Sequence, residues 1–131
     1  MLLREYVTRY IKEAISYNLL NLVSKELNNI TKNHKASNNN HHIYYDLVKV
    51  VDKFGLKPIG AGLYRHVYSI PEEDWVLKFA YEDSGGEWAN AEEVAISVGS
   101  HGTGARDLFV KIFEWDKINE NPEWIIAEKV I

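Results

Sequence analysis

The sequence of 131 residues contains no cysteine, which excludes disulfides and thiolate–metal sites. It also lacks an apolar run long enough to span a lipid bilayer. The first residues mix charged side chains such as Arg4, Glu5 and Arg9 with apolar ones, which is not the pattern of a secretory signal. We therefore expect a cytoplasmic protein that does not enter a membrane.

The charges that are present are unevenly distributed. Residues 1–70 carry ten Lys and Arg against five Asp and Glu, a balance of +5, whereas residues 71–131 carry five against fourteen, a balance of −9. An acidic half repels nucleic-acid phosphates and attracts basic surfaces. We expect no direct nucleic-acid binding, and we expect Glu72, Glu73 and Asp74 to bind a basic partner. The alternative is a solvated acidic surface that keeps a small protein in solution.

Residues 1–54 predict a helical extension. Apolar residues recur every four positions from Leu3 to Leu27, which is typical of a helix that ends near Ile30. A second helix is predicted just before Gly55, which stands where a C-cap glycine belongs. The apolar stripe of the first helix is wide. We expect this stripe to pack on its own domain. The alternatives are a homodimer contact and a groove for another protein.

The two helices are separated by an asparagine-rich stretch, residues 31–42, which predicts an exposed polar loop. His34, His41 and His42 are candidate metal ligands in this stretch. They have no acidic or cysteine partner at the spacing of a metal site, so we expect none.

Residues 55–131 predict a single α+β domain. Two short apolar runs flank Gly60 and Gly62 as a strand–turn–strand, and a third strand, residues 75–80, contains Lys78, which needs a partner in an apolar strand. A helix over residues 87–98 and strands over 108–115 and 123–130 follow. This order predicts a five-stranded antiparallel sheet with one covering helix, preceded by the N-terminal helical extension.

The order of elements over about residues 56–131 resembles the small lobe of protein kinases. Gly60 and Gly62 match the first two glycines of the loop that covers the phosphates of ATP. Val67 matches the valine that packs on the adenine ring, and Lys78 matches the lysine that contacts the α- and β-phosphates. Glu93 is the best match for the glutamate that pairs with this lysine, with Glu92 as the alternative.

The resemblance extends to the hinge, whose backbone pairs with adenine and which residues 127–130 match. It implies a nucleotide site that consists of Gly60, Gly62, Val67, Lys78, Glu93, Glu128 and Val130. Two positions depart from the family pattern. Arg65 replaces the third glycine of the loop, and Val76 replaces a small alanine and narrows the adenine slot. We therefore expect no cofactor, with weakly bound ATP as the alternative.

Phosphoryl transfer also needs a base and magnesium ligands, which kinases carry in their large lobe. Residues 105–108, Ala-Arg-Asp-Leu, imitate the catalytic motif. The magnesium-binding asparagine expected five residues after Asp107 is Ile112, however, and no Asp-Phe-Gly follows. If 131 residues are the whole protein, we expect no kinase activity, and Lys78 and Glu93 then persist as a structural ion pair.

These observations predict a non-catalytic, kinase-like small-lobe protein that acts by binding another macromolecule. The face that a kinase small lobe turns towards its large lobe would be covered by the helices of residues 1–54, by a partner or by a second copy. Its small size and its lysine- and asparagine-rich composition are similar to those of phage or mobile-element products. By that analogy it would inhibit a basic host protein. The alternatives are a nucleotide-binding module and a fragment of a longer kinase.

Overall fold

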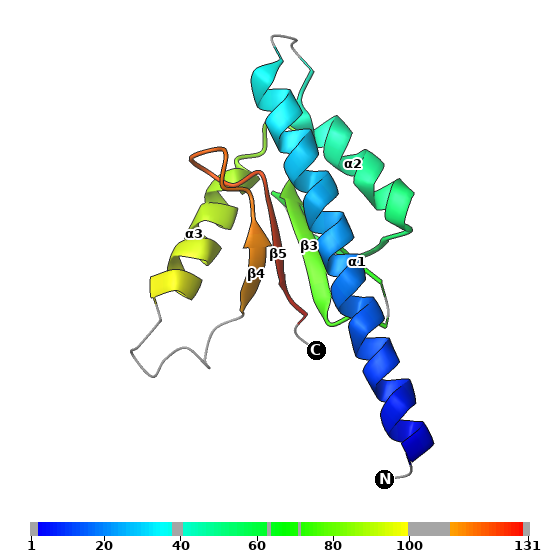
Figure 1. The fold of residues 1–131 in the computed structure, drawn as a ribbon. Helices are drawn as coiled ribbons and strands as arrows, with labels where there is room; N and C mark the ends of the chain where they lie inside the picture. The colour runs from blue at the N-terminus through cyan, green and yellow to red at the C-terminus, as the bar shows by residue number, and fades with distance from the viewer. Residues whose placement is uncertain (1–2, 38–40, 63, 71, 100–110, 130–131) are drawn as a thin grey trace.

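The computed structural model describes residues 3–37, 41–62, 64–70, 72–99 and 111–129. Along the chain lie α1 (Leu3–Ala36), α2 (Ile43–Phe54), β1 (Lys57–Ala61), β2 (Arg65–Ser69), β3 (Trp75–Ala80), α3 (Gly86–Gly99), β4 (Ile112–Trp115) and β5 (Trp124–Glu128). Figure 1 shows the sheet between α3 on one side and α1 with α2 on the other.

The five strands form one antiparallel sheet in the order β1-β2-β3-β5-β4. Its centre is β3, where Lys78 lies between Val67 of β2 and Ile125 of β5. The predicted α+β class, the five-stranded sheet and the N-terminal helix are confirmed. The predicted fourth strand begins within residues 108–110, which lie outside the described residues, and the described strand starts at Ile112.

The two faces of the sheet carry different side chains because residues alternate along each strand. Trp75, Leu77 and Phe79 of β3 belong to the buried core, together with Val23 and Leu27 of α1 and the apolar side of α2. The opposite face carries Lys78, next to α3. The helices of residues 1–54 therefore cover the face that does not carry Lys78. They do not cover the side of the sheet on which the kinase resemblance places a nucleotide.

The short helix α2 lies where the sequence predicts it, and its C-cap is the predicted glycine, whereas its N-cap, His42, was not predicted. The ring Nδ1 of His42 accepts a hydrogen bond from the backbone N–H of Tyr44 at 3.1 Å, which caps the first turn. Gly55 adopts a left-handed conformation with φ of 66°, and Leu56 N–H donates to the carbonyl of Val51 at 2.9 Å. The C-cap glycine is thus confirmed.

The first helix is longer than predicted. It continues through Ala36, so the loop prediction for residues 31–42 is wrong for its first half. The reason is Thr31, whose fully buried hydroxyl donates to the carbonyl of Leu27 at 2.7 Å and accepts from the indole Nε1–H of Trp124 at 2.9 Å. This pair of bonds holds the polar end of α1 on β5, and the composition of a single segment does not reveal it.

The other end of α1 extends beyond the sheet, as the blue end of the ribbon in Figure 1 shows. A helix of 34 residues is about 50 Å long, whereas a strand of six residues spans about 20 Å. Residues 3–9, which we call the projection, are all exposed. Among the described residues, no helix has an apolar stretch long enough to cross a membrane.

Replacing Thr31 by Val should lower the free energy of unfolding by about 1–2 kcal/mol, because the buried Trp124 Nε1–H loses its acceptor. Urea unfolding measures the change. The matched control is Thr8→Val, which removes a similar hydroxyl-to-carbonyl bond at an exposed position of the same helix. Equal effects of the two substitutions would contradict the role assigned to Thr31.

Candidate functional site

Two of the residues that the kinase resemblance singles out, Lys78 and Glu93, are in contact. Lys78 Nζ lies 3.3 Å from Glu93 Oε2 and 3.4 Å from Oε1, so β3 and α3 are joined by the predicted ion pair. Glu92, the alternative partner, is exposed. The carboxylate is about 28% exposed and Lys78 about 20%, so the pair is partly shielded from water.

A second cation makes the shorter contact. Arg65, at the start of β2, donates from Nη2 to Glu93 Oε1 at 2.6 Å and from Nη1 to Asn90 Oδ1 at 3.0 Å. The amide group of the fully buried Asn90 in turn donates to the carbonyl of Pro122 at 2.9 Å. Arg65 therefore links β2, α3 and the loop before β5, through a fork of donors that a lysine does not have.

This arrangement sets the ionisation of Glu93. Partial burial alone would raise the pKa of its carboxyl group. The hydrogen bond from Arg65 and the charges of Lys78 and Arg65 outweigh burial and hold the pKa of Glu93 below its usual value. Glu93 is therefore ionised at neutral pH and carries one negative charge between two positive ones.

The sequence offered two signals for the wider cluster. Arg65 departs from the glycine of the family pattern, and Asn90 and Glu93 stand three residues apart on one side of a helix. In the kinase resemblance, Arg65 stands in place of the third glycine of the loop. The structure shows that its guanidinium group is a structural partner of α3.

The two glycines of the predicted phosphate loop lie in and after β1. A methyl group added at Gly60 or Gly62 would meet no atom within 4 Å, and neither residue has a positive φ. Gly62 N–H donates to the carbonyl of Arg65 at 3.0 Å, which closes the turn. Contacts within the described part of the chain do not require glycine at either position.

The remaining predicted nucleotide residues are spread along the sheet. Val67 is partly buried on β2, beside Lys78, and Val76 is buried on β3. Glu128 is exposed at the end of β5, where its backbone N–H donates to the carbonyl of Lys111 at 2.8 Å. Val130 lies outside the described residues.

The predicted acidic partner site follows β2. Glu72 and Asp74 are exposed, but Glu73 is only 9% exposed and its N–H donates to the carbonyl of Ile70 at 2.9 Å. The turn therefore buries the middle residue of the run, and partner binding by Glu73 stays a prediction. Glu72 and Asp74 remain accessible.

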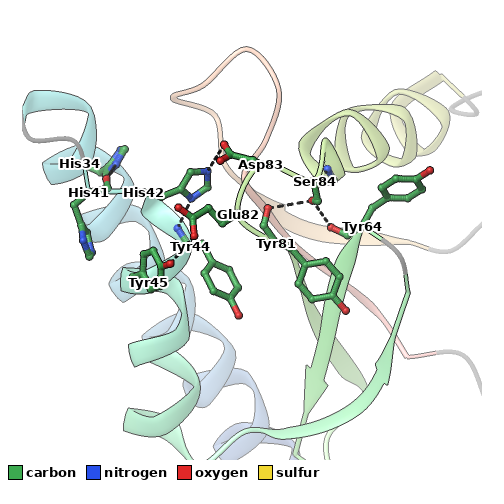
Figure 2. Close-up of polar contacts among 11 residues, drawn as sticks. His34, His41, His42, Tyr44, Tyr45, Tyr64, Tyr81, Glu82, Asp83 and Ser84 are labelled. Carbon is green, nitrogen blue, oxygen red and sulfur yellow. Dashed lines mark hydrogen bonds and ion pairs between the residues drawn. The ribbon is translucent and has the colours of Figure 1, made fainter.

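The loop between β3 and α3 fixes the position at which α3 begins. Ser84 Oγ lies 2.7 Å from the carbonyl oxygen of Tyr64 and accepts from Gly86 N–H at 3.1 Å. Tyr81 N–H also donates to the carbonyl of Tyr64, at 3.1 Å. Figure 2 shows Ser84 between Tyr64 and Tyr81. These bonds tie the first turn of α3 to the start of β2, close to Arg65.

The histidines that the sequence offered as metal ligands lie at the other side of Figure 2. His34 Nε2 lies 2.7 Å from the carbonyl oxygen of His41, and His41 Nε2 lies 3.2 Å from Asp46 Oδ1. His42 caps α2, and its Nε2 lies 3.9 Å from Asp83. In the described part of the chain, no three His, Asp or Glu side chains are grouped to hold a metal ion.

Comparison of the chain with protein-family models, with curated proteins and with solved structures finds no match.

Replacing Arg65 by Met should lower the free energy of unfolding by about 2 kcal/mol, and Lys78→Met by about 1 kcal/mol. Arg65 makes the shorter contact with Glu93, and it also satisfies the buried Asn90. Guanidinium unfolding measures both variants. Lys49→Met is the control, because it removes an exposed pair with Asp46 at 3.7 Å, which should contribute little. A larger loss for Lys78→Met than for Arg65→Met would refute this order.

Stability should also depend on pH through Glu123. Burial raises the pKa of its carboxyl group to about 7. The nearby charges of Glu87 and Asp116 act in the same direction, and His34 acts in the opposite direction. The folded state then keeps a proton that the unfolded state releases, so stability should fall by about 1–2 kcal/mol as the pH rises from 5 to 8.

The measurement is urea unfolding across this pH range. Glu123→Gln should flatten the pH profile and raise stability above pH 7. Glu120→Gln, at an exposed position of the same loop, serves as the control and should leave the profile as it is. A wild-type profile that rises with pH over this range would show that Glu123 does not have the raised pKa.

Proposed function

We propose that the protein is a non-catalytic binding protein, built on a domain like a kinase small lobe, and that it acts through protein–protein contact. The observation that carries the proposal is the projection. Leu3, Tyr6 and Val7 are 78%, 60% and 45% exposed, although they are large apolar side chains on a regular helix. Apolar side chains grouped in this way on a projecting helix are typical of a contact surface.

The cluster around Glu93 supports the non-catalytic part of the proposal. Arg65 and Lys78 both bind the same carboxylate, and Asn90 extends the cluster to the loop before β5. A partly buried cluster of this kind needs each of its members for stability. Retention of the kinase-like lysine and glutamate therefore has a structural reason that does not require phosphoryl transfer.

The partner is a protein, and an inhibitory role against a host protein is one form that this function would take. The acidic turn with Glu72 and Asp74 is a second accessible surface, and its charge suits a basic partner. It lies at the β2–β3 connection, whereas the projection belongs to α1, so the two surfaces can be tested separately.

A second candidate function is nucleotide binding. The observation that favours it is the open space at Gly60 and Gly62, together with a lysine on the same sheet that is still partly exposed. No described contact requires glycine at these two positions, and the missing side chains leave room for a phosphate group to approach the backbone. Two observations argue against nucleotide binding. Glu93 already binds both Lys78 and Arg65. Val76 is also bulkier than the alanine that kinases usually have at this position.

The function is tested by affinity purification of the tagged chain from extract of its source cells. Leu3→Glu/Val7→Glu should abolish the capture of partner protein without a change in melting temperature, because both positions are exposed. Charge reversal of Glu72 and Asp74 to Lys is the matched variant on the acidic turn and should leave capture intact. Capture that survives Leu3→Glu/Val7→Glu and is lost on charge reversal would move the interface to the acidic turn.

A further inference from the structure

A stripe of apolar residues runs along the side of α3 that faces away from the sheet. Trp88, Ala91, Ala95 and Val98 are spaced i, i+3, i+7 and i+10, so they share one side of the helix, and we call them the outer stripe. Trp88 and Val98 are 67% and 50% exposed. In Figure 1, α1 and α2 lie on the other side of the sheet, so neither of these helices covers the outer stripe.

The outer stripe borders a groove between α3 and the strands. Ala91, Ala95 and Val98 form one wall of this groove, which has a volume of about 430 Å³, and Trp115 and Pro122 line its other side. A stripe with this spacing, about 15 Å long, is what a helix presents to a second helix packed along it. Alanine side chains let the axis of a second helix come close. The shape therefore suits a helix of about three turns.

The charges around the outer stripe are negative. α3 carries Glu87, Glu92 and Glu93 and contains no Lys or Arg, and Glu120 lines the groove. Glu93 faces the sheet and is bound by cations of the domain, whereas Glu87 and Glu92 flank the stripe on its two sides. Among the residues that the structure describes, Glu87, Glu92 and Glu120 form no ion pair. These three carboxylates are available to a partner.

The groove also contains a cation, Lys117, which already has partners. Its Nζ lies 3.7 Å from Glu114 Oε2 and 4.6 Å from the centre of the Trp115 ring. An approaching molecule therefore meets an apolar stripe between carboxylates that no cation of the described chain neutralises. Such a surface repels nucleic acid and anionic lipid, and it attracts Lys and Arg side chains.

We propose that the outer stripe and its groove bind a basic amphipathic helix of a partner protein, with its apolar side chains on the stripe and its Lys or Arg side chains beside Glu87, Glu92 and Glu120. The proposal goes beyond the proposed function, because this surface is neither the projection nor the acidic turn. Two short helices bury less surface than a standard interface of about 1,600 Å², so we expect a dissociation constant on the order of 10 µM.

Fluorescence anisotropy of a labelled synthetic peptide, titrated with the purified full chain, tests the proposal. The probe is a helical peptide of about 14 residues with leucine at i, i+3, i+7 and i+10 and lysine on both sides of the leucines. The wild type should bind it with a dissociation constant on the order of 10 µM. A peptide with glutamate in place of the lysines, and one with serine in place of the leucines, should each bind at least about tenfold more weakly.

Variants of the chain locate the binding surface. Ala95→Lys places a long charged side chain on the stripe, and Glu92→Lys reverses a flanking charge, so each should weaken binding of the leucine–lysine peptide at least about tenfold. The matched control is Glu72→Lys/Asp74→Lys, which changes the net charge more but lies on the acidic turn, and should leave binding intact. All of these positions are exposed, so the melting temperature should stay nearly unchanged.

No binding of the leucine–lysine peptide at about 1 mM would overturn the proposal. Equal binding of the serine peptide, or equal losses in Glu92→Lys and in the control, would also overturn it, because charge alone would then explain the attraction. If sedimentation equilibrium shows a wild-type dimer that Ala95→Lys abolishes, a second copy occupies the groove and the partner helix is wrong. Leu3→Glu/Val7→Glu should leave peptide binding intact, so failure of this proposal and failure of the proposed function are distinguishable.

Discussion

The fold depends on a single carboxylate with two cations. Glu93 accepts from Arg65 at the start of β2 and from Lys78 in the middle of β3, so it fixes α3 on one face of the sheet. Removal of either cation leaves a partly buried charge without its full set of partners, which costs more than the pair itself contributes. With α3 held there, the apolar face of β3 and β5 is left for α1 and α2, and the buried bond between Thr31 and Trp124 anchors that second layer.

Local patterns predicted much of this arrangement. The alternation in β2, the apolar run of β3 and the C-cap of α2 are properties of short segments, and the sheet follows from their order. The pairing of Lys78 with Glu93 came from the kinase resemblance. The end of α1 was missed because the residues after Ile30 are polar, and the bond between Thr31 and the distant Trp124 is not visible in the sequence of this segment. The burial of Glu73 was missed for the same reason, since the sequence of a turn does not reveal which of its residues faces inwards.

In the structure, the cluster around Glu93 and the exposed apolar surface of the projection lie in different parts of the molecule. Lys78 and Glu93 lie partly buried between β3 and α3, where Arg65 and Asn90 make them part of the framework of the domain. The exposed apolar surface that carries the proposed function lies elsewhere, on the projection of α1. In the function proposed above, the internal cluster holds the domain together and the projecting helix binds another protein, and neither role requires phosphoryl transfer. The acidic turn and the open glycines are the two features that this account leaves without a role.

The central claim is that the cluster around Glu93 is a structural device, and titration with Mg·ATP tests it most directly. A ligand at a hundred times its dissociation constant stabilises a protein by about 2.7 kcal/mol, which a melting curve detects readily. The account predicts no change in melting temperature at millimolar Mg·ATP. A saturable rise in melting temperature that both Gly60→Ala and Lys78→Met abolish would contradict it, and would show that the glycines and the lysine form a working nucleotide site.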